Sequence, residues 1–168
     1  MIIQKENPLL REKSNMVGDI QSPETKKLIK KMADAMFAEP DGIGIAAPQI
    51  GARLQIFLVA EEVLDMDKGM EKSADRKNKK YITFINPVIK KKSVKKSKDI
   101  EGCLSVRGLY GEVVRREKVT IRYSDENGTP RERGASQLFA RVIQHEMDHL
   151  EGVLFIDKAK NIKKISHA

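Results

Sequence analysis

The residues best suited to chemistry in this sequence lie in one short segment near the C-terminus, residues 144–150 (QHEMDHL). The segment contains His145 and His149, two of the three histidines of the chain, and Glu146 follows the first of them. On a helix, side chains four residues apart project from one face, so both imidazoles can bind one metal ion with the carboxylate beside it. The alternative is a core helix whose histidines are hydrogen-bonded inside the protein.

The residues around these histidines have the pattern of a buried helix. Apolar residues recur every three or four positions between Leu138 and Leu150, with Ser136 as a candidate N-cap and Gly152 as a stop. Because the apolar positions nearly encircle the helix, we expect it to be buried. Histidines and a glutamate in such a helix would lack partners unless they had a task, which favours the metal site.

Cys103 is the only cysteine and a candidate third ligand. A lone cysteine is usually a small buried apolar residue. Beside two histidines, however, it would leave one position of a tetrahedral site open for water, as catalytic zinc sites do. A single cysteine forms no intramolecular disulfide, so we expect a reducing compartment, the cytoplasm.

The length and the distribution of apolar residues indicate one globular domain over residues 1–168. The N-terminus has no basic segment followed by an apolar one, and no apolar run approaches the length that spans a membrane. We therefore expect a soluble cytoplasmic protein with no membrane partner.

The net charge of +8 is concentrated in residues 68–98, where twelve Lys and Arg residues face only Glu71 and Asp75. Such a patch attracts polyanions, for example the RNA of a ribosome or anionic lipid. The alternative is a solvated loop, since no aromatic residues alternate with the lysines to stack on bases. We expect no specific nucleic-acid ligand.

The remaining elements predict an α+β fold, in which antiparallel sheets pack around the central metal-binding helix and a second helix lies near the N-terminus. Ser22 and Pro23 begin that second helix, which should end near residue 38 and bury Leu28, Met32, Ala35 and Met36. Strands are expected at residues 54–59, 81–89 and 119–123, and the last should return as a hairpin through residues 131–134. Pro87 predicts an edge or a bend, and residues 65–80 predict an exposed loop.

Residues 42–49 (GIGIAAPQ) match the glycine pattern of dinucleotide-binding loops only by chance. A true nucleotide loop follows a strand and begins a helix, whereas this segment follows a helix and leads into a strand. Its small residues instead suit a backbone that must approach another group closely, and Gln49 is its only side chain with hydrogen-bond donors.

Three motifs together resemble the peptide deformylase family in order and spacing. They are residues 42–49 (GIGIAAPQ), 101–105 (EGCLS) and 144–150 (QHEMDHL). The likeness extends over nearly the whole chain, including residues 8–11 (PLLR) and 85–87 (INP). Arg107 and Arg116 depart from the family, because many relatives have proline at both places, and residues 65–80 form a longer loop than usual.

The resemblance implies a reaction and a role for each site residue. The reaction is removal of the N-formyl group from the initiator methionine of nascent peptides. Cys103, His145 and His149 would bind one divalent metal, which lowers the pKa of a bound water. Further implied roles are proton transfer for Glu146, oxyanion stabilisation for Gln49 and the Leu104 N–H, substrate binding for Ile43, Gly44, Gly102, Leu138 and Val142, and support of the cysteine loop by Glu101 and Arg115.

The family is known for using Fe²⁺ and for losing activity when the iron oxidises, although these ligands also suit Zn²⁺, Ni²⁺ or Co²⁺. The resemblance also implies that the substrate is met as it leaves the ribosome. Two other functions remain open at this point, a zinc peptidase and a nonenzymatic basic module that binds RNA or the ribosome.

Overall fold

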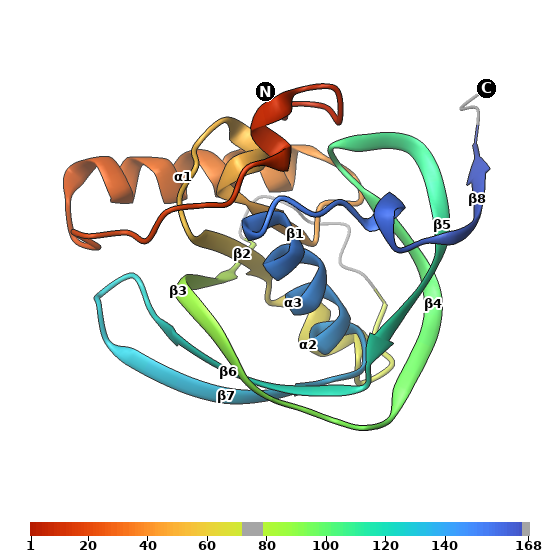
Figure 1. The fold of residues 1–168 in the computed structure, drawn as a ribbon. Helices are drawn as coiled ribbons and strands as arrows, with labels where there is room; N and C mark the ends of the chain where they lie inside the picture. Colours follow the sequence, from red (N-terminus) through yellow and green to blue (C-terminus); the bar gives the residue numbers. More distant parts are fainter. Residues whose placement is uncertain (72–78, 166–168) are drawn as a thin grey trace.

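The computed structural model describes residues 1–71 and 79–165. In this part of the chain, helix α3 (Gln137–Leu150) runs through the centre of the fold (Figure 1). Most residues of α3 are buried, as its encircling apolar pattern predicts. Antiparallel strands surround the helix, so the predicted α+β fold is confirmed.

The strands form two antiparallel sheets. The first has five strands in the order β1 (Gly44–Ala46), β2 (Ile56–Ala60), β3 (Tyr81–Lys92), β6 (Lys118–Ser124) and β7 (Pro130–Ser136). The second has the order β4 (Lys96–Cys103), β5 (Val106–Arg116) and β8 (Lys160–Lys164). Short 3₁₀ turns lie at Pro8–Arg11, Ala47–Ile50 and Phe155–Asp157.

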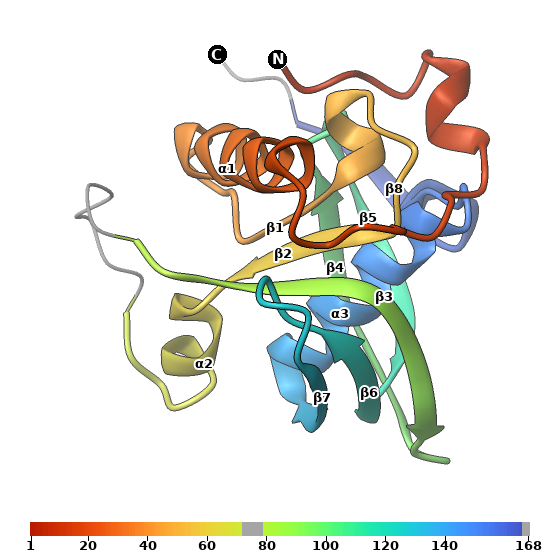
Figure 2. The same ribbon diagram turned by 90° about the vertical axis from the view of Figure 1, so that its left-hand side faces the viewer.

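Strand β2 is buried on both faces and separates two apolar cores. Because side chains alternate along a strand, Phe57 and Val59 pack in the core around α3, while Ile56 and Leu58 pack in the core around α1 (Pro23–Ala38). Figure 2 shows α1 and α3 on opposite sides of β2. The five-stranded sheet therefore holds α3 from one side only.

Helix α1 has the bounds and the Ser22 cap that the sequence predicts. Its buried stripe differs in part, because Ile29 and Ala33 are buried with Met32 and Met36, whereas Leu28 and Ala35 are only partly buried. The predicted stripe is therefore rotated slightly around the helix axis from the observed one.

The predicted strands and hairpin are present, with small shifts in their ends. Pro87 lies where the register between β3 and β6 shifts, and the preceding Asn86 has φ +49°. Strand β2 pairs with β3 only as far as Ile85, so Pro87 lies at a bend and also where β3 continues with β6 as its one strand partner, as predicted. Strands β6 and β7 pair as the predicted hairpin.

Residues 65–80 are not wholly the exposed loop that the sequence predicts. Helix α2 (Glu62–Met66) covers their start, and the Lys79 ammonium pairs with the Glu62 carboxylate at 2.6 Å with both side chains largely buried. The part at residues 72–78 lies outside the described residues. Within the described ranges, no helix is both long and apolar enough to cross a membrane.

The capping hydrogen bonds at the N-terminus of α3 come from Asp67, at the end of α2, and not from the Ser136 side chain. The Asp67 carboxylate accepts hydrogen bonds from the N–H groups of Leu138 (3.0 Å) and Phe139 (3.1 Å), whereas the Ser136 side chain makes no capping bond. A carboxylate also complements the partial positive charge of a helix N-terminus. Ser136 occupies the N-cap position that the sequence predicts, but the capping hydrogen bonds come from a distant segment.

We expect Asp67→Ala to lower the free energy of unfolding by about 1 to 2 kcal/mol, because two N–H groups at the start of α3 lose their acceptor. Chemical denaturation would measure the change. Ser136→Ala is the matched control and should change it by less than about 0.5 kcal/mol. Equal losses in the two variants would contradict the Asp67 cap.

Candidate active site and metal centre

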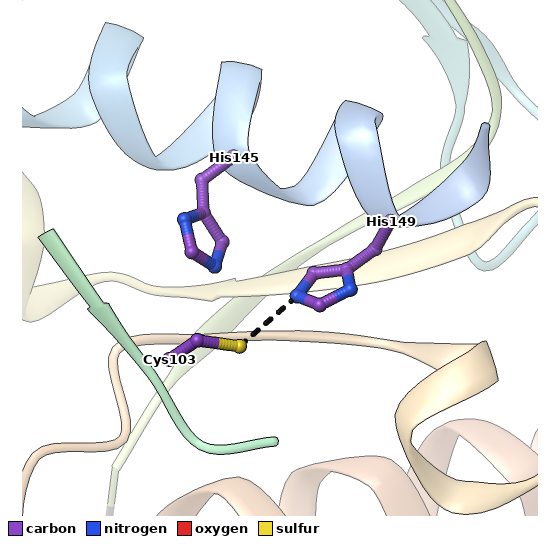
Figure 3. Close-up of side chains that lie close together, drawn as sticks. All are labelled: Cys103, His145 and His149. Atoms are coloured by element: carbon purple, nitrogen blue, oxygen red, sulfur yellow. Dashed lines mark hydrogen bonds between the residues drawn. The ribbon is translucent and has the colours of Figure 1, made fainter. Parts of the chain in front are cut away.

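Three candidate ligands converge where the end of β4 meets α3. Cys103 lies at the end of β4, and His145 and His149 project from one face of α3 toward it (Figure 3). One donor atom of each lies within 4.8 Å of the others, and the His149 Nε2 is 3.3 Å from the Cys103 sulfur. A tetrahedral metal with one sulfur and one nitrogen ligand holds these atoms about 3.5 Å apart. The donor set therefore fits a divalent metal ion in both chemistry and spacing.

Glu101 orients the first histidine. The His145 Nδ1 lies 3.0 Å from the Glu101 Oε2, so the other ring nitrogen is turned toward Cys103. Burial alone would raise the pKa of Glu101, but hydrogen bonds from Arg115 and His145 hold this pKa well below its ordinary value. An ionised carboxylate behind a histidine fixes the ring as metal-binding histidines require.

The pKa values of the two histidines are shifted in opposite directions. Burial lowers the pKa of His149 well below its ordinary value, and the charges of His145 and Arg115 lower it further. Burial also opposes protonation of His145, but Cys103 and Glu101 raise its pKa well above the ordinary value. A neutral His149 offers a ring nitrogen lone pair, which is the form that binds a metal.

Two arginines hold Glu101 in place. Arg115, which the family resemblance pairs with Glu101, makes two hydrogen bonds to its carboxylate, at 2.8 and 2.9 Å, and a third to Asp148 on α3. Arg141 donates another at 2.8 Å and was not predicted. The sequence does carry a signal for it, because Arg141, His145 and His149 follow one another at four-residue spacing on a helix that is otherwise mostly apolar.

Glu146 lies in the interior beside this cluster. Its Oε2 has no hydrogen-bond partner among the described residues. Burial raises its pKa to about 7. The backbone of β1 passes so close that a Cβ on Gly44 would lie 2.6 Å from the Glu146 Oε1. The predicted close backbone approach is therefore an approach to a carboxylate.

The Gln49 side chain points at the cysteine in a defined orientation. Its Oε1 accepts a hydrogen bond from the Ala46 N–H at 2.8 Å, so its Nε2 faces Ser105 Oγ at 3.1 Å and the Cys103 sulfur at 3.7 Å. The sequence offered no sign that Ser105 would hold the amide. Leu104 follows Cys103 in the same turn and lines the same cavity.

These groups open into a cavity of about 320 Å³. Its walls include every residue predicted to bind substrate, namely Ile43, Gly44, Gly102, Leu138 and Val142. A Cβ on Gly102 would lie 2.6 Å from the Tyr110 ring, so this position leaves no space for a side chain.

The two departures from the family pattern have different surroundings. Arg107 lies at the rim of the cavity, where its guanidinium pairs with the Glu39 carboxylate at 2.7 Å. Arg116 is not among the residues that line the cavity, and its guanidinium donates to the Ser93 and Val94 carbonyls. Arg107 therefore belongs to the rim of the cavity, and Arg116 stabilises the turn between β3 of one sheet and β4 of the other.

Known proteins resemble this chain over almost its entire length. The family model described as polypeptide deformylase matches residues 1–165. A peptide deformylase of Pelagibacter ubique is 42% identical over 163 residues, which cover 97% of this chain and 87% of that protein.

Solved structures agree with this likeness. The structure of a peptide deformylase from Synechococcus elongatus in complex with actinonin has a TM-score of 0.82 and 36% identity, and the match covers 96% of this chain and 79% of that one. A probable peptide deformylase from Synechococcus phage S-SSM7 has a TM-score of 0.80 and 35% identity, with 94% and 98% covered. With a family match of this extent and relatives of this identity, the chain belongs to the polypeptide deformylase family.

Proposed function

We propose that Cys103, His145 and His149 hold the metal ion of a peptide deformylase and that Glu146 and Gln49 act on the substrate beside it. As a member of this family, the chain is a metal-dependent hydrolase that removes the N-formyl group from newly made polypeptides and releases formate. The observation that carries the residue assignment is the convergence of one thiol and two imidazoles beside a buried carboxylate with a free oxygen. We also propose that residues 1–168 act as one catalytic domain in the cytoplasm.

The chemistry divides between the metal and the side chains around it. A divalent metal held by Cys103, His145 and His149 would supply the positive charge that lowers the pKa of water and favours its attack. Glu146 accepts a proton from the attacking water and passes it to the departing amine. Gln49 Nε2 and the Leu104 N–H donate hydrogen bonds to the oxygen that becomes negative during attack.

The peptide would bind as an added strand between the two sheets. In the described part of the chain, β1 and β4 are the end strands of their sheets, and both line the cavity. Gly44 on β1 and Gly102 on β4 both line the cavity, so a peptide that lies between these strands would pass their backbones. The methionine side chain would then enter the apolar part formed by Ile43, Leu138 and Val142.

We expect Glu146→Gln to keep the fold and the bound metal but to lower formate release from formyl-Met-Ala by roughly 10² to 10⁴, because proton transfer is lost. Formate release and metal content would be measured together. Glu151→Gln is the matched control, since Glu151 is an exposed acid just after α3 that pairs with Lys13. Near-normal turnover by Glu146→Gln would exclude the proposed role. Hydrolysis of the unformylated peptide Met-Ala-Met by the wild-type protein would favour the alternative function, a zinc peptidase.

The physiological metal is proposed to be Fe²⁺. Thiolate and imidazole ligands bind Zn²⁺ and Ni²⁺ tightly, but affinity does not decide which ion gives the fastest reaction. Protein purified in air should contain zinc or nickel or have low activity, and anaerobic reconstitution with Fe²⁺ should raise turnover. Elemental analysis with formate release per bound metal would measure this. Equal turnover with zinc and iron would contradict it.

The basic residues are proposed to contact ribosomal RNA. A hollow of about 770 Å³ is lined by cations from several elements, Lys68, Lys91, Lys92, Lys118 and Arg133. The one acid on its lining, Asp67, already accepts two hydrogen bonds from α3. Lys90, Lys95 and Lys96 are exposed nearby in sequence. This gathering of cations around a hollow supports binding to phosphate groups over the alternative of a solvated loop.

Replacing Lys90, Lys91, Lys92, Lys95 and Lys96 with Gln should weaken ribosome association and flatten its salt dependence, because fewer counterions are released. Turnover of formyl-Met-Ala should not change. Cosedimentation with ribosomes at several salt concentrations would measure the effect. The matched control removes five other exposed lysines, Lys26, Lys27, Lys31, Lys163 and Lys164. If the two variants show the same salt dependence of ribosome association, the alternative holds and these lysines belong to a solvated loop.

A further inference from the structure

The proposed metal ligands come from two separate parts of the fold. Cys103 belongs to the three-stranded sheet, whereas His145 and His149 belong to α3. The spacing of sulfur and imidazoles therefore depends on how firmly this sheet is attached to the helix. Links between the two parts decide whether the three donor atoms stay at metal-binding distance.

Arg141 makes the broadest of these links. It lies on α3, one turn before His145, and is buried. Its Nη1 donates to the Glu101 Oε1 (2.8 Å) and the Val113 carbonyl (2.9 Å), and its Nη2 donates to the Ser97 carbonyl (2.9 Å). One guanidinium thus joins the helix to the main chain of both β4 and β5 and to the carboxylate that orients His145.

Arg115 makes a second link from the side of the sheet, because it holds Glu101 and also donates to the Asp148 carboxylate on α3 at 2.5 Å. Arg141 differs from it in starting on the helix and in reaching the main chain of both β4 and β5. Without Arg141, the only hydrogen bond between Glu101 and α3 would be the one to His145 itself. Arg141 holds α3 without using His145, so the Glu101 carboxylate and the His145 ring are already aligned before a metal binds.

We propose that Arg141 is a positioning residue of the metal centre, which sets the spacing between the Cys103 sulfur and the two imidazoles by joining α3 to β4, β5 and Glu101. The inference rests on the proposed metal ligands. It extends the known pairing of a carboxylate with a metal-binding histidine by one further residue, whose planar fork of donors reaches three residues on two strands.

The test uses the full chain loaded with Co²⁺, whose visible spectrum reports the ligand geometry. Arg141→Met should change that spectrum and speed the loss of Co²⁺ to a chelator by about tenfold, the lower range for residues behind metal ligands. Gln144→Met is the matched control. Gln144 also ties α3 to β5, through two hydrogen bonds to the Arg116 backbone, but it does not contact Glu101. It should lower the melting temperature and leave the spectrum and the Co²⁺ loss unchanged.

Arg141→Lys separates charge from geometry and serves if Arg141→Met does not fold. A single ammonium keeps the charge but cannot reach Glu101 and Ser97 together, so the altered spectrum should persist. Full recovery with lysine, or equal effects of Arg141→Met and Gln144→Met on Co²⁺ loss, would overturn the proposal. Cys103→Ser tests the underlying ligand assignment separately. If this variant holds Co²⁺ as tightly as the wild type, Cys103 is not a ligand, and that result would contradict the proposed function and not only the role of Arg141.

Discussion

The buried carboxylate of Glu101 is the interaction on which the rest of the site depends. A buried charge is costly unless its hydrogen bonds are satisfied, and Glu101 meets this demand with two arginines and a histidine. These partners come from β5 and from α3, so both elements must be in place at once. In return, the hydrogen bond to Glu101 keeps the His145 ring turned toward Cys103.

Sequence alone predicted the parts of the site that depend on local spacing. The pairing of His145 with His149 follows from helical periodicity, and the bounds of α1 follow from Ser22 and Pro23. The bend at Pro87 also follows from a local property, its missing N–H. Each of these depends on residues within a few positions of one another.

Contacts between distant segments could not be predicted in this way. Asp67 caps α3 from another helix, and Arg141 hydrogen-bonds three residues on two strands. No periodicity in the chain encodes which distant carbonyl or carboxylate an arginine will meet. Arg141 was nevertheless an anomaly in a mostly apolar helix, and a buried cation implies a nearby anion. That reasoning would have found the need for a partner but not its identity.

The edges of the two sheets have a consequence for the behaviour of the protein in a crowded solution. A cleft that accepts a peptide as an added strand must leave strand edges open, and open edges also invite pairing with other copies of the chain. Here β1 is only three residues long and buried, which gives a second chain little to pair with. Strand β4 is longer, but its exposed start carries Lys96 and Lys98. Repulsion between such lysines on two copies opposes aggregation, so the same charges keep the edge that we propose for the peptide from pairing with another copy.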